Sequence, residues 1–87
     1  MKLDHIGIAV RSLARARKFY EGLGLRVEGV ETLPAEKVRV AMLPLGETRI
    51  ELMEPTGDDS AIARFIQKRG EGLHHIAIEV QGLAAHL

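Results

Sequence analysis

The sequence contains no cysteine, so disulfide bonds and thiolate metal sites are excluded. It also lacks any apolar run near the roughly 20 residues that a membrane-spanning helix needs, and we expect no signal peptide ahead of its first apolar segment. Neither sign of charge is in excess, because twelve basic side chains balance twelve acidic ones. This balance provides no general attraction for nucleic acid or an anionic membrane. We therefore expect a cytoplasmic protein that binds neither and recognises a small molecule locally.

The clearest pattern that is present is an internal repeat. Residues 3–14, LDHIGIAVRSLA, return as residues 73–84, LHHIAIEVQGLA, and seven of the twelve positions are identical. Self-similarity of this kind indicates a fold built from copies of one supersecondary unit. The second copy stops soon after its opening strand, so we expect the natural domain to continue and these 87 residues to be a fragment.

The spacing of apolar residues predicts an α+β fold, a βαβββ unit followed by the opening strand of a second, truncated copy. Along residues 3–10, bulky apolar side chains alternate with small side chains and one histidine, as in a strand whose two faces differ. Further strands are expected over residues 26–30, 37–43, 48–53 and 73–80. We expect residues 1–55 to form the first unit, 56–72 a linker with a short helix, and 73–87 the start of the second unit.

Capping residues predict where the helices begin. Ser12 is suited to cap the first helix and Ser60 the short helix of the linker. The inner stripe of the first helix is expected at Leu13, Ala16, Tyr20 and Leu23. Residues 83–87 resemble the first turn of an equivalent helix in the second copy.

Three side chains are candidate metal ligands. The repeat places His5 and His75 at equivalent positions of the two opening strands, on the face opposite the bulky residues. Glu51 lies on the last strand of the first unit between two apolar residues, where a carboxylate is costly to bury unless it is paired or coordinated. Two imidazoles and a carboxylate suit Zn, Co, Ni, Mn or Fe(II). We expect these three side chains to converge on one concave face, and His74 to point to the packed face or into the preceding turn.

Five segments carry a resemblance to a known family. They are HIGIAV at residues 5–10, KFYEGLGL at 18–25, LPLGETRIELMEP at 43–55, DSAIARF at 59–65 and GEGLHHIAIEV at 70–80. Together they resemble the methylmalonyl-CoA epimerase family of the vicinal-oxygen-chelate superfamily, which also includes glyoxalase I, extradiol dioxygenases and bleomycin-resistance proteins. The opening strand is specific only to the superfamily, whereas the later segments narrow the resemblance to the epimerase.

The resemblance implies a metal-dependent enzyme that epimerises methylmalonyl-CoA by removing and returning the C2 proton through a metal-stabilised enolate. It implies His5, Glu51 and His75 as three of four protein ligands, Glu51 as a catalytic residue, and a divalent Co, Mn, Zn or Ni ion as cofactor. The fourth ligand would fall near position 121 by the repeat offset (51 plus 70), so we expect these 87 residues alone to be inactive. The partner would be an acyl-CoA substrate. We also expect a homodimer, because an exposed sheet edge invites self-association.

Three alternatives remain open. A glyoxalase I-type lactoylglutathione lyase would use similarly placed ligands, although residues 54–72 fit that family less well. An Fe(II) dioxygenase also uses two histidines and a carboxylate, but such enzymes are usually much longer. A metal-free, drug-sequestering binding module of the same fold would have no reason to keep all three candidate ligands.

Overall fold

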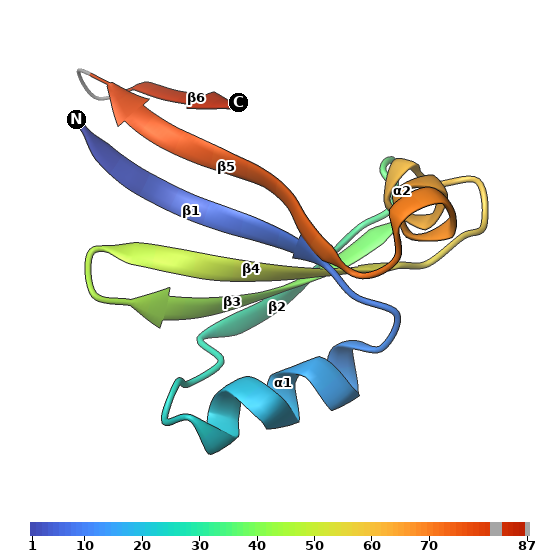
Figure 1. The fold of residues 1–87 in the computed structure, drawn as a ribbon, viewed down its shortest axis with the longest axis horizontal. Coiled ribbons are helices and arrows are strands. Elements are labelled where there is room, and N and C mark those ends of the chain that lie inside the picture. Colours follow the sequence, from blue (N-terminus) through green and yellow to red (C-terminus); the bar gives the residue numbers. More distant parts are fainter. Residues whose placement is uncertain (81–82, 87) are drawn as a thin grey trace.

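The computed structural model describes residues 1–80 and 83–86, which form one six-stranded sheet and two helices (Figure 1). In chain order the elements are β1 (Lys2–Ala9), α1 (Leu13–Gly22), β2 (Gly29–Leu33), β3 (Val38–Leu45), β4 (Thr48–Pro55), α2 (Ala61–Arg69), β5 (Gly72–Val80) and β6 (Leu83–His86). The predicted α+β class and the βαβββ order of the first unit are confirmed. Neither helix of this described part is long and apolar enough to cross a bilayer.

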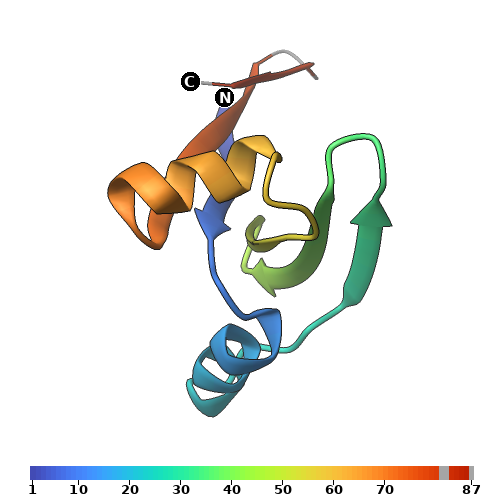
Figure 2. The same cartoon turned by 90° about the vertical axis from the view of Figure 1, so that its right-hand side faces the viewer.

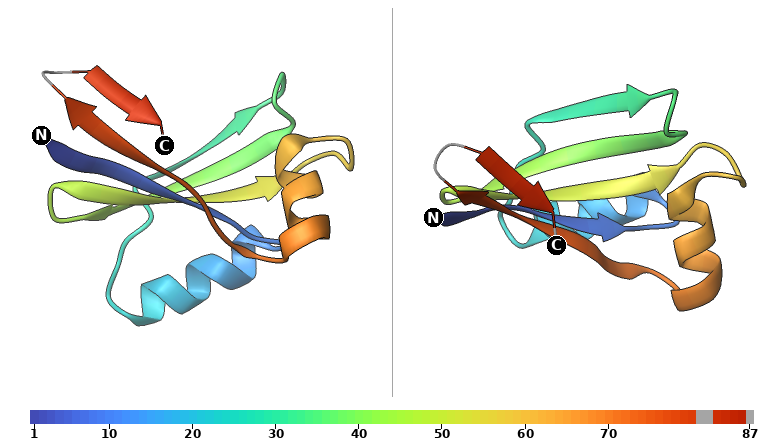
Figure 3. Two further views of the ribbon diagram at one scale, coloured as in Figure 1. Left: turned by 45° about the horizontal axis from the view of Figure 1, so that its top comes forward. Right: turned by 90° about the horizontal axis from the view of Figure 1, so that it is seen from above.

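The two copies of the repeated sequence lie side by side as β1 and β5. The strand order is β2-β3-β4-β1-β5-β6, with β1 parallel to β4 and antiparallel to β5. Figures 1 and 3 show the two strands lying next to each other, with β4 beside β1 and β6 beside β5. One sheet therefore contains both copies, and the division of the chain at residues 55 and 72 stays a prediction.

Each face of the sheet packs against a different helix. Because side chains alternate along a strand, neighbouring residues of β1, β3 and β4 enter different cores. The core beneath α1 contains Val10, Leu13, Ala41, Leu43, Ile50 and Leu52. The core beneath α2 contains Ala9, Val38, Val40, Met53, Ile62 and Ile66. Figure 2 shows α1 and α2 on opposite sides of the strands.

Both predicted helix caps are present. The Ser12 hydroxyl accepts a hydrogen bond from the Arg15 N–H at 3.2 Å, and the buried Ser60 hydroxyl accepts one from the Ala63 N–H at 3.0 Å. Leu23 departs from the predicted stripe, since its side chain is 64% exposed. The physical reason is that α1 ends at Gly22, so Leu23 lies past the last turn that contacts the sheet.

The turn between β2 and β3 is tied to the start of α2. Lys37 has a positive φ of 53°, which is uncommon for a residue with a side chain. Two contacts hold it there: its carbonyl accepts a hydrogen bond from the Thr56 N–H at 2.8 Å, and its ammonium group pairs with Asp59. The hydrogen bond from the Lys37 ammonium group to Asp59 lowers the pKa of the Asp59 carboxyl.

Two sequence-based expectations are wrong in position or type. The strand expected at residues 26–30 begins only at Gly29, because Leu25 and Val27 pack against the α1 core instead of pairing along β3. The helix expected at residues 83–87 is the strand β6 over Leu83–His86, antiparallel to β5. A single helical turn is unstable in water, whereas a strand at this position can form backbone hydrogen bonds with the edge of β5. Residue 87 lies outside the described residues.

Candidate metal-binding site

The two repeated histidines meet on the α2 side of the sheet. His5 on β1 is 7% exposed, and its Nε2 atom lies 3.1 Å from Nε2 of His75 on β5. The rings are nearly perpendicular, with centroids 5.2 Å apart. Residues separated by 70 positions are thus brought into direct contact by the pairing of the two opening strands.

Gly7 provides the room that this contact needs. It lies opposite His75 in the β1–β5 register and two residues beyond His5 on the same face of β1. A β-carbon at position 7 would lie only 2.3 Å from Cε1 of His75. The His75 ring therefore crosses β1 above a glycine, and a β-carbon at this position would force the ring to move from its place beside His5.

Glu51 lies beside the two histidines but is held by another group. On β4 it is the register partner of Gly7, and its Oε2 atom lies 3.8 Å from Nδ1 of His5. The same oxygen accepts a hydrogen bond from Nε of Arg49 at 2.8 Å. The structure thus brings all three candidate ligands into one neighbourhood and places Glu51 in an ion pair with Arg49.

Asp4 and Arg49 are site residues that the sequence reasoning missed. Asp4 Oδ2 lies 2.8 Å from Nδ1 of His5 and 3.4 Å from the Arg49 guanidinium. The hydrogen bond from His5 lowers the pKa of the Asp4 carboxyl most strongly, the charge of Arg49 lowers it further, and desolvation opposes both. The sequence does show an acidic residue directly before His5. Strict alternation along a strand, however, assigns Asp4 and His5 to opposite faces of the sheet and so leaves Asp4 out of the site.

His74 does not point into a packed face. Its side chain is exposed, its ring centroid lies 5.0 Å from that of Phe65 on α2, and its Nδ1 is 2.9 Å from Nδ1 of His75. The expectation of a packed face was wrong because the register of β5 against β1 shifts between Gly7 and Ile8 and skips His74, so strand alternation does not decide where its side chain points. His74 consequently contacts the imidazole of a candidate ligand.

The donor chemistry of these side chains fits a divalent ion. Two imidazole nitrogens 3.1 Å apart can both reach one ion at about 2.0–2.1 Å, the usual Zn–N distance. Glu51 would have to turn from Arg49 toward that point. Across residues 1–80 and 83–86, no three His, Asp or Glu side chains are already grouped around one ion position. The pair His5 and His75 is therefore in place, and a third ligand requires a side-chain rotation.

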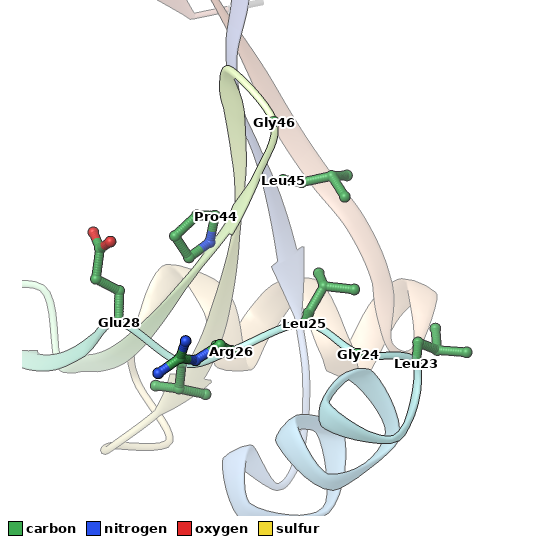
Figure 4. A pocket seen from close by; sticks show the side chains of 9 residues that line it. Leu23, Gly24, Leu25, Arg26, Glu28, Pro44, Leu45 and Gly46 are labelled. Carbon is green, nitrogen blue, oxygen red and sulfur yellow. The ribbon is translucent and has the colours of Figure 1, made fainter.

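A separate hollow of about 730 Å³ lies elsewhere on the molecule, between residues 23–28 and residues 44–46 (Figure 4). Its wall includes Leu25 and Val27, which pack on the α1 core. None of the candidate ligands lines it. We therefore assign the candidate site to the histidine pair, where the donor groups meet, rather than to this hollow.

Comparison with known proteins agrees with this architecture. The profile of the Glyoxalase/Bleomycin resistance protein/Dioxygenase superfamily matches residues 4–87. The chain is 47% identical over 87 residues to the uncharacterised protein YqjC of Bacillus subtilis, covering 99% of this chain and 62% of that protein. It is 44% identical over 86 residues to the mitochondrial methylmalonyl-CoA epimerase of Homo sapiens, covering 97% of this chain and 49% of that protein.

A solved structure gives the same result in three dimensions. The solved structure of a methylmalonyl-CoA epimerase in complex with methylmalonyl-CoA and NH4+ superposes with a TM-score of 0.85 at 39% identity, covering 88% of this chain and 58% of that chain. The present chain spans only about half to two thirds of the length of these relatives. From the profile match and these identities, the chain belongs to the Glyoxalase/Bleomycin resistance protein/Dioxygenase superfamily, with methylmalonyl-CoA epimerases among its relatives.

Proposed function

We propose that the natural polypeptide containing these residues is a methylmalonyl-CoA epimerase, which removes the proton at C2 of methylmalonyl-CoA and returns one to the opposite face. The observation that carries the proposal is the meeting of His5 and His75 beside Glu51. The choice of substrate is supported by relatives that are named methylmalonyl-CoA epimerase. The human enzyme is one of them, and this chain is 44% identical to it.

We further propose that His5, His75 and Glu51 hold a divalent Co, Mn, Zn or Ni ion. Such an ion, when bound, supplies positive charge that stabilises the negative charge developing on the substrate oxygens as the proton leaves. The two histidines would contribute their Nε2 atoms, which already face one another. We also propose the carboxylate of Glu51, whose Oε2 lies 3.8 Å from Nδ1 of His5, as the acid–base group.

The surroundings of Glu51 suit a role in proton transfer. It sits on β4 between Gly7 of β1 and Met42 of β3, and its side chain is 16% exposed. Apolar residues flank it on the same face, which limits the access of water to the carboxylate. Arg49 fixes the direction of the carboxylate through its Nε hydrogen bond. Glu51 is thereby held beside His5, with little of its side chain open to solvent.

Deuterium exchange at C2 tests the proposal. The natural polypeptide, loaded with Co, Mn, Zn or Ni, is mixed with methylmalonyl-CoA in D₂O, and loss of the C2 proton signal is followed by NMR. We expect exchange catalysed by the wild-type protein and a decrease of about 10²–10⁴-fold for Glu51→Gln, the usual contribution of general acid–base catalysis. Glu47→Gln, at an exposed glutamate in the β3–β4 turn, is the matched control and should retain the wild-type rate.

Several outcomes would overturn the proposal. An unchanged exchange rate in Glu51→Gln would remove Glu51 from proton transfer. Isomerisation of a glutathione hemithioacetal without C2 exchange would favour a lactoylglutathione lyase. Absence of bound metal after purification and after incubation with each of the four ions would favour a metal-free binding module.

The homodimer and the cytoplasmic location stay predictions. Large apolar side chains remain exposed on β1 and β5, namely those of Leu3, Leu73 and Val80. Light scattering on the natural polypeptide would test whether association covers them.

A further inference from the structure

We infer that Asp4 is the positioning residue for His5, holding the imidazole so that its Nε2 atom faces His75. The inference rests on the proposed metal site, because only there does the direction of Nε2 affect function. The geometry that points to it is the 2.8 Å contact between Asp4 Oδ2 and His5 Nδ1.

An irregularity of β1 makes this contact between neighbouring residues possible. In a regular strand the side chains of Asp4 and His5 would point to opposite faces of the sheet. The register of β1 against β5 shifts between Leu3 and His5, skipping Asp4. Such irregularities re-aim side chains and are often found beside functional sites. The Thr48 hydroxyl donates a hydrogen bond to the Asp4 carbonyl at 3.1 Å and so holds the backbone in this form.

The chemistry of the contact determines which ring nitrogen of His5 carries the proton. An ionised carboxylate only accepts hydrogen bonds, so Nδ1 of His5 must be the donor to Asp4. In the neutral imidazole the other nitrogen, Nε2, then presents a lone pair. That atom is the one 3.1 Å from Nε2 of His75. A carboxylate behind a histidine ligand is the usual arrangement that fixes its tautomer and ring orientation.

Arg49 keeps Asp4 in place. Its guanidinium lies 3.4 Å from Asp4 Oδ2 while its Nε binds Glu51. Arg49 therefore bridges the carboxylate behind His5 and the carboxylate proposed as a ligand. If Glu51 turned toward an ion, the guanidinium of Arg49 would keep its ion pair with Asp4. Its positive charge would therefore still be balanced by a carboxylate.

The tautomer of His5 is measured directly by ¹⁵N NMR of the histidine side chains in the metal-free natural polypeptide. In the wild type at neutral pH we expect His5 to carry its proton on Nδ1. In Asp4→Ala we expect the proton to move to Nε2 in a substantial fraction of molecules. Asp4→Asn keeps an acceptor oxygen and should restore the wild-type tautomer. The matched control is Asp58→Ala, which removes an exposed carboxylate remote from the site and should leave His5 unchanged.

Binding of Zn²⁺ alone, followed by calorimetry, provides the second readout. Loss of a residue behind a metal ligand typically weakens affinity by about 10–100-fold, and we expect a decrease of this size in Asp4→Ala. Asp4→Asn should recover most of the affinity, and Asp58→Ala should match the wild type. A residue that served only to stabilise the fold would lower the unfolding midpoint without changing the tautomer.

The two readouts separate this inference from the proposed function. A wild-type His5 protonated on Nε2, or an unchanged tautomer in folded Asp4→Ala, would overturn the positioning role even if Zn²⁺ binds. A wild-type protein that binds no Zn²⁺, yet shows the expected change of tautomer, would retain the hydrogen-bond role of Asp4 and refute the metal site. If Asp4→Ala fails to fold, the wild-type tautomer alone still decides the question.

Discussion

The imidazole of His75 occupies the space directly above Gly7 that a β-carbon would fill. The distance from an ideal β-carbon at position 7 to Cε1 of His75 is 2.3 Å, well inside any real van der Waals contact. One missing methyl group therefore allows two histidines from neighbouring strands to touch.

Replacing Gly7 with alanine should separate the two histidines. We expect Gly7→Ala to displace the His75 ring and weaken Zn²⁺ binding at least about tenfold, with overpacking lowering the free energy of unfolding by about 1–3 kcal/mol. Calorimetric titration and urea denaturation measure the two effects. Gly22→Ala is the control, since a β-carbon there meets no atom within 4 Å, and it should preserve Zn²⁺ affinity. Wild-type affinity in Gly7→Ala would show that the contact of the rings is not needed for binding.

Leu52 provides a test of the separation between the two faces of the sheet. Its side chain is fully buried in the α1 core, on the face opposite the histidines. We expect Leu52→Ala to cost about 2–5 kcal/mol in urea unfolding because of the lost contacts and the cavity left behind. Leu45→Ala, at a leucine that is 45% exposed, should cost far less. Under conditions where both variants are folded, Zn²⁺ affinity should stay near that of the wild type, and a large loss in Leu52→Ala would contradict this separation.

The two serine caps should differ in their contributions to stability. Ser60 is 4% exposed and its hydroxyl accepts the Ala63 N–H within a buried contact, whereas the Ser12 cap is exposed. We expect Ser60→Ala to lower the free energy of unfolding by about 1–2 kcal/mol and Ser12→Ala by about 0.5–1 kcal/mol, within the usual range for helix caps. Urea denaturation of the two variants side by side measures the difference. Equal losses would mean that burial of the cap does not matter.

The Lys37–Asp59 pair predicts a pH dependence of stability in acid. The pKa of Asp59 is lowered from its ordinary value of 3.8 by the hydrogen bond from Lys37. A lowered carboxyl pKa contributes stability that is complete above the unfolded value and is lost as the pH falls through the folded value. We therefore expect the melting temperature of Asp59→Asn to lie below that of the wild type at pH 7 and to approach it by pH 2. Asp58→Asn is the control, and a gap for Asp59→Asn that stays constant with pH would contradict the prediction.

The repeat and the strand alternation were sufficient to predict the central part of the fold. They identified the βαβββ order and placed His5 and His75 on one face, because strand periodicity is a local property that the sequence shows directly. The contact between the two histidines then follows from the pairing of β1 with β5. Their role as metal ligands stays a prediction.

Other features depend on contacts that local patterns do not contain. Asp4 could not be assigned to the site because the irregularity that re-aims it exists only in the pairing of β1 with β5. The start of β2 was misplaced because Leu25 and Val27 follow an alternating pattern yet pack on α1. The segment Leu83–His86 is too short to determine its own conformation, so the available edge of β5 determines it.

The position of β1 between β4 and β5 has a consequence for biosynthesis. β1 is synthesised first, whereas its neighbours β4 and β5 end only at Pro55 and Val80. The edge of β1 that pairs with β5 therefore has no partner strand while residues 56–80 are added. At about 5–20 residues per second, this interval lasts roughly one to five seconds. During that time the nascent chain presents an unpaired strand edge with His5 on it, a state open to chaperones and to neighbouring nascent chains. The two histidines can meet only when this interval ends.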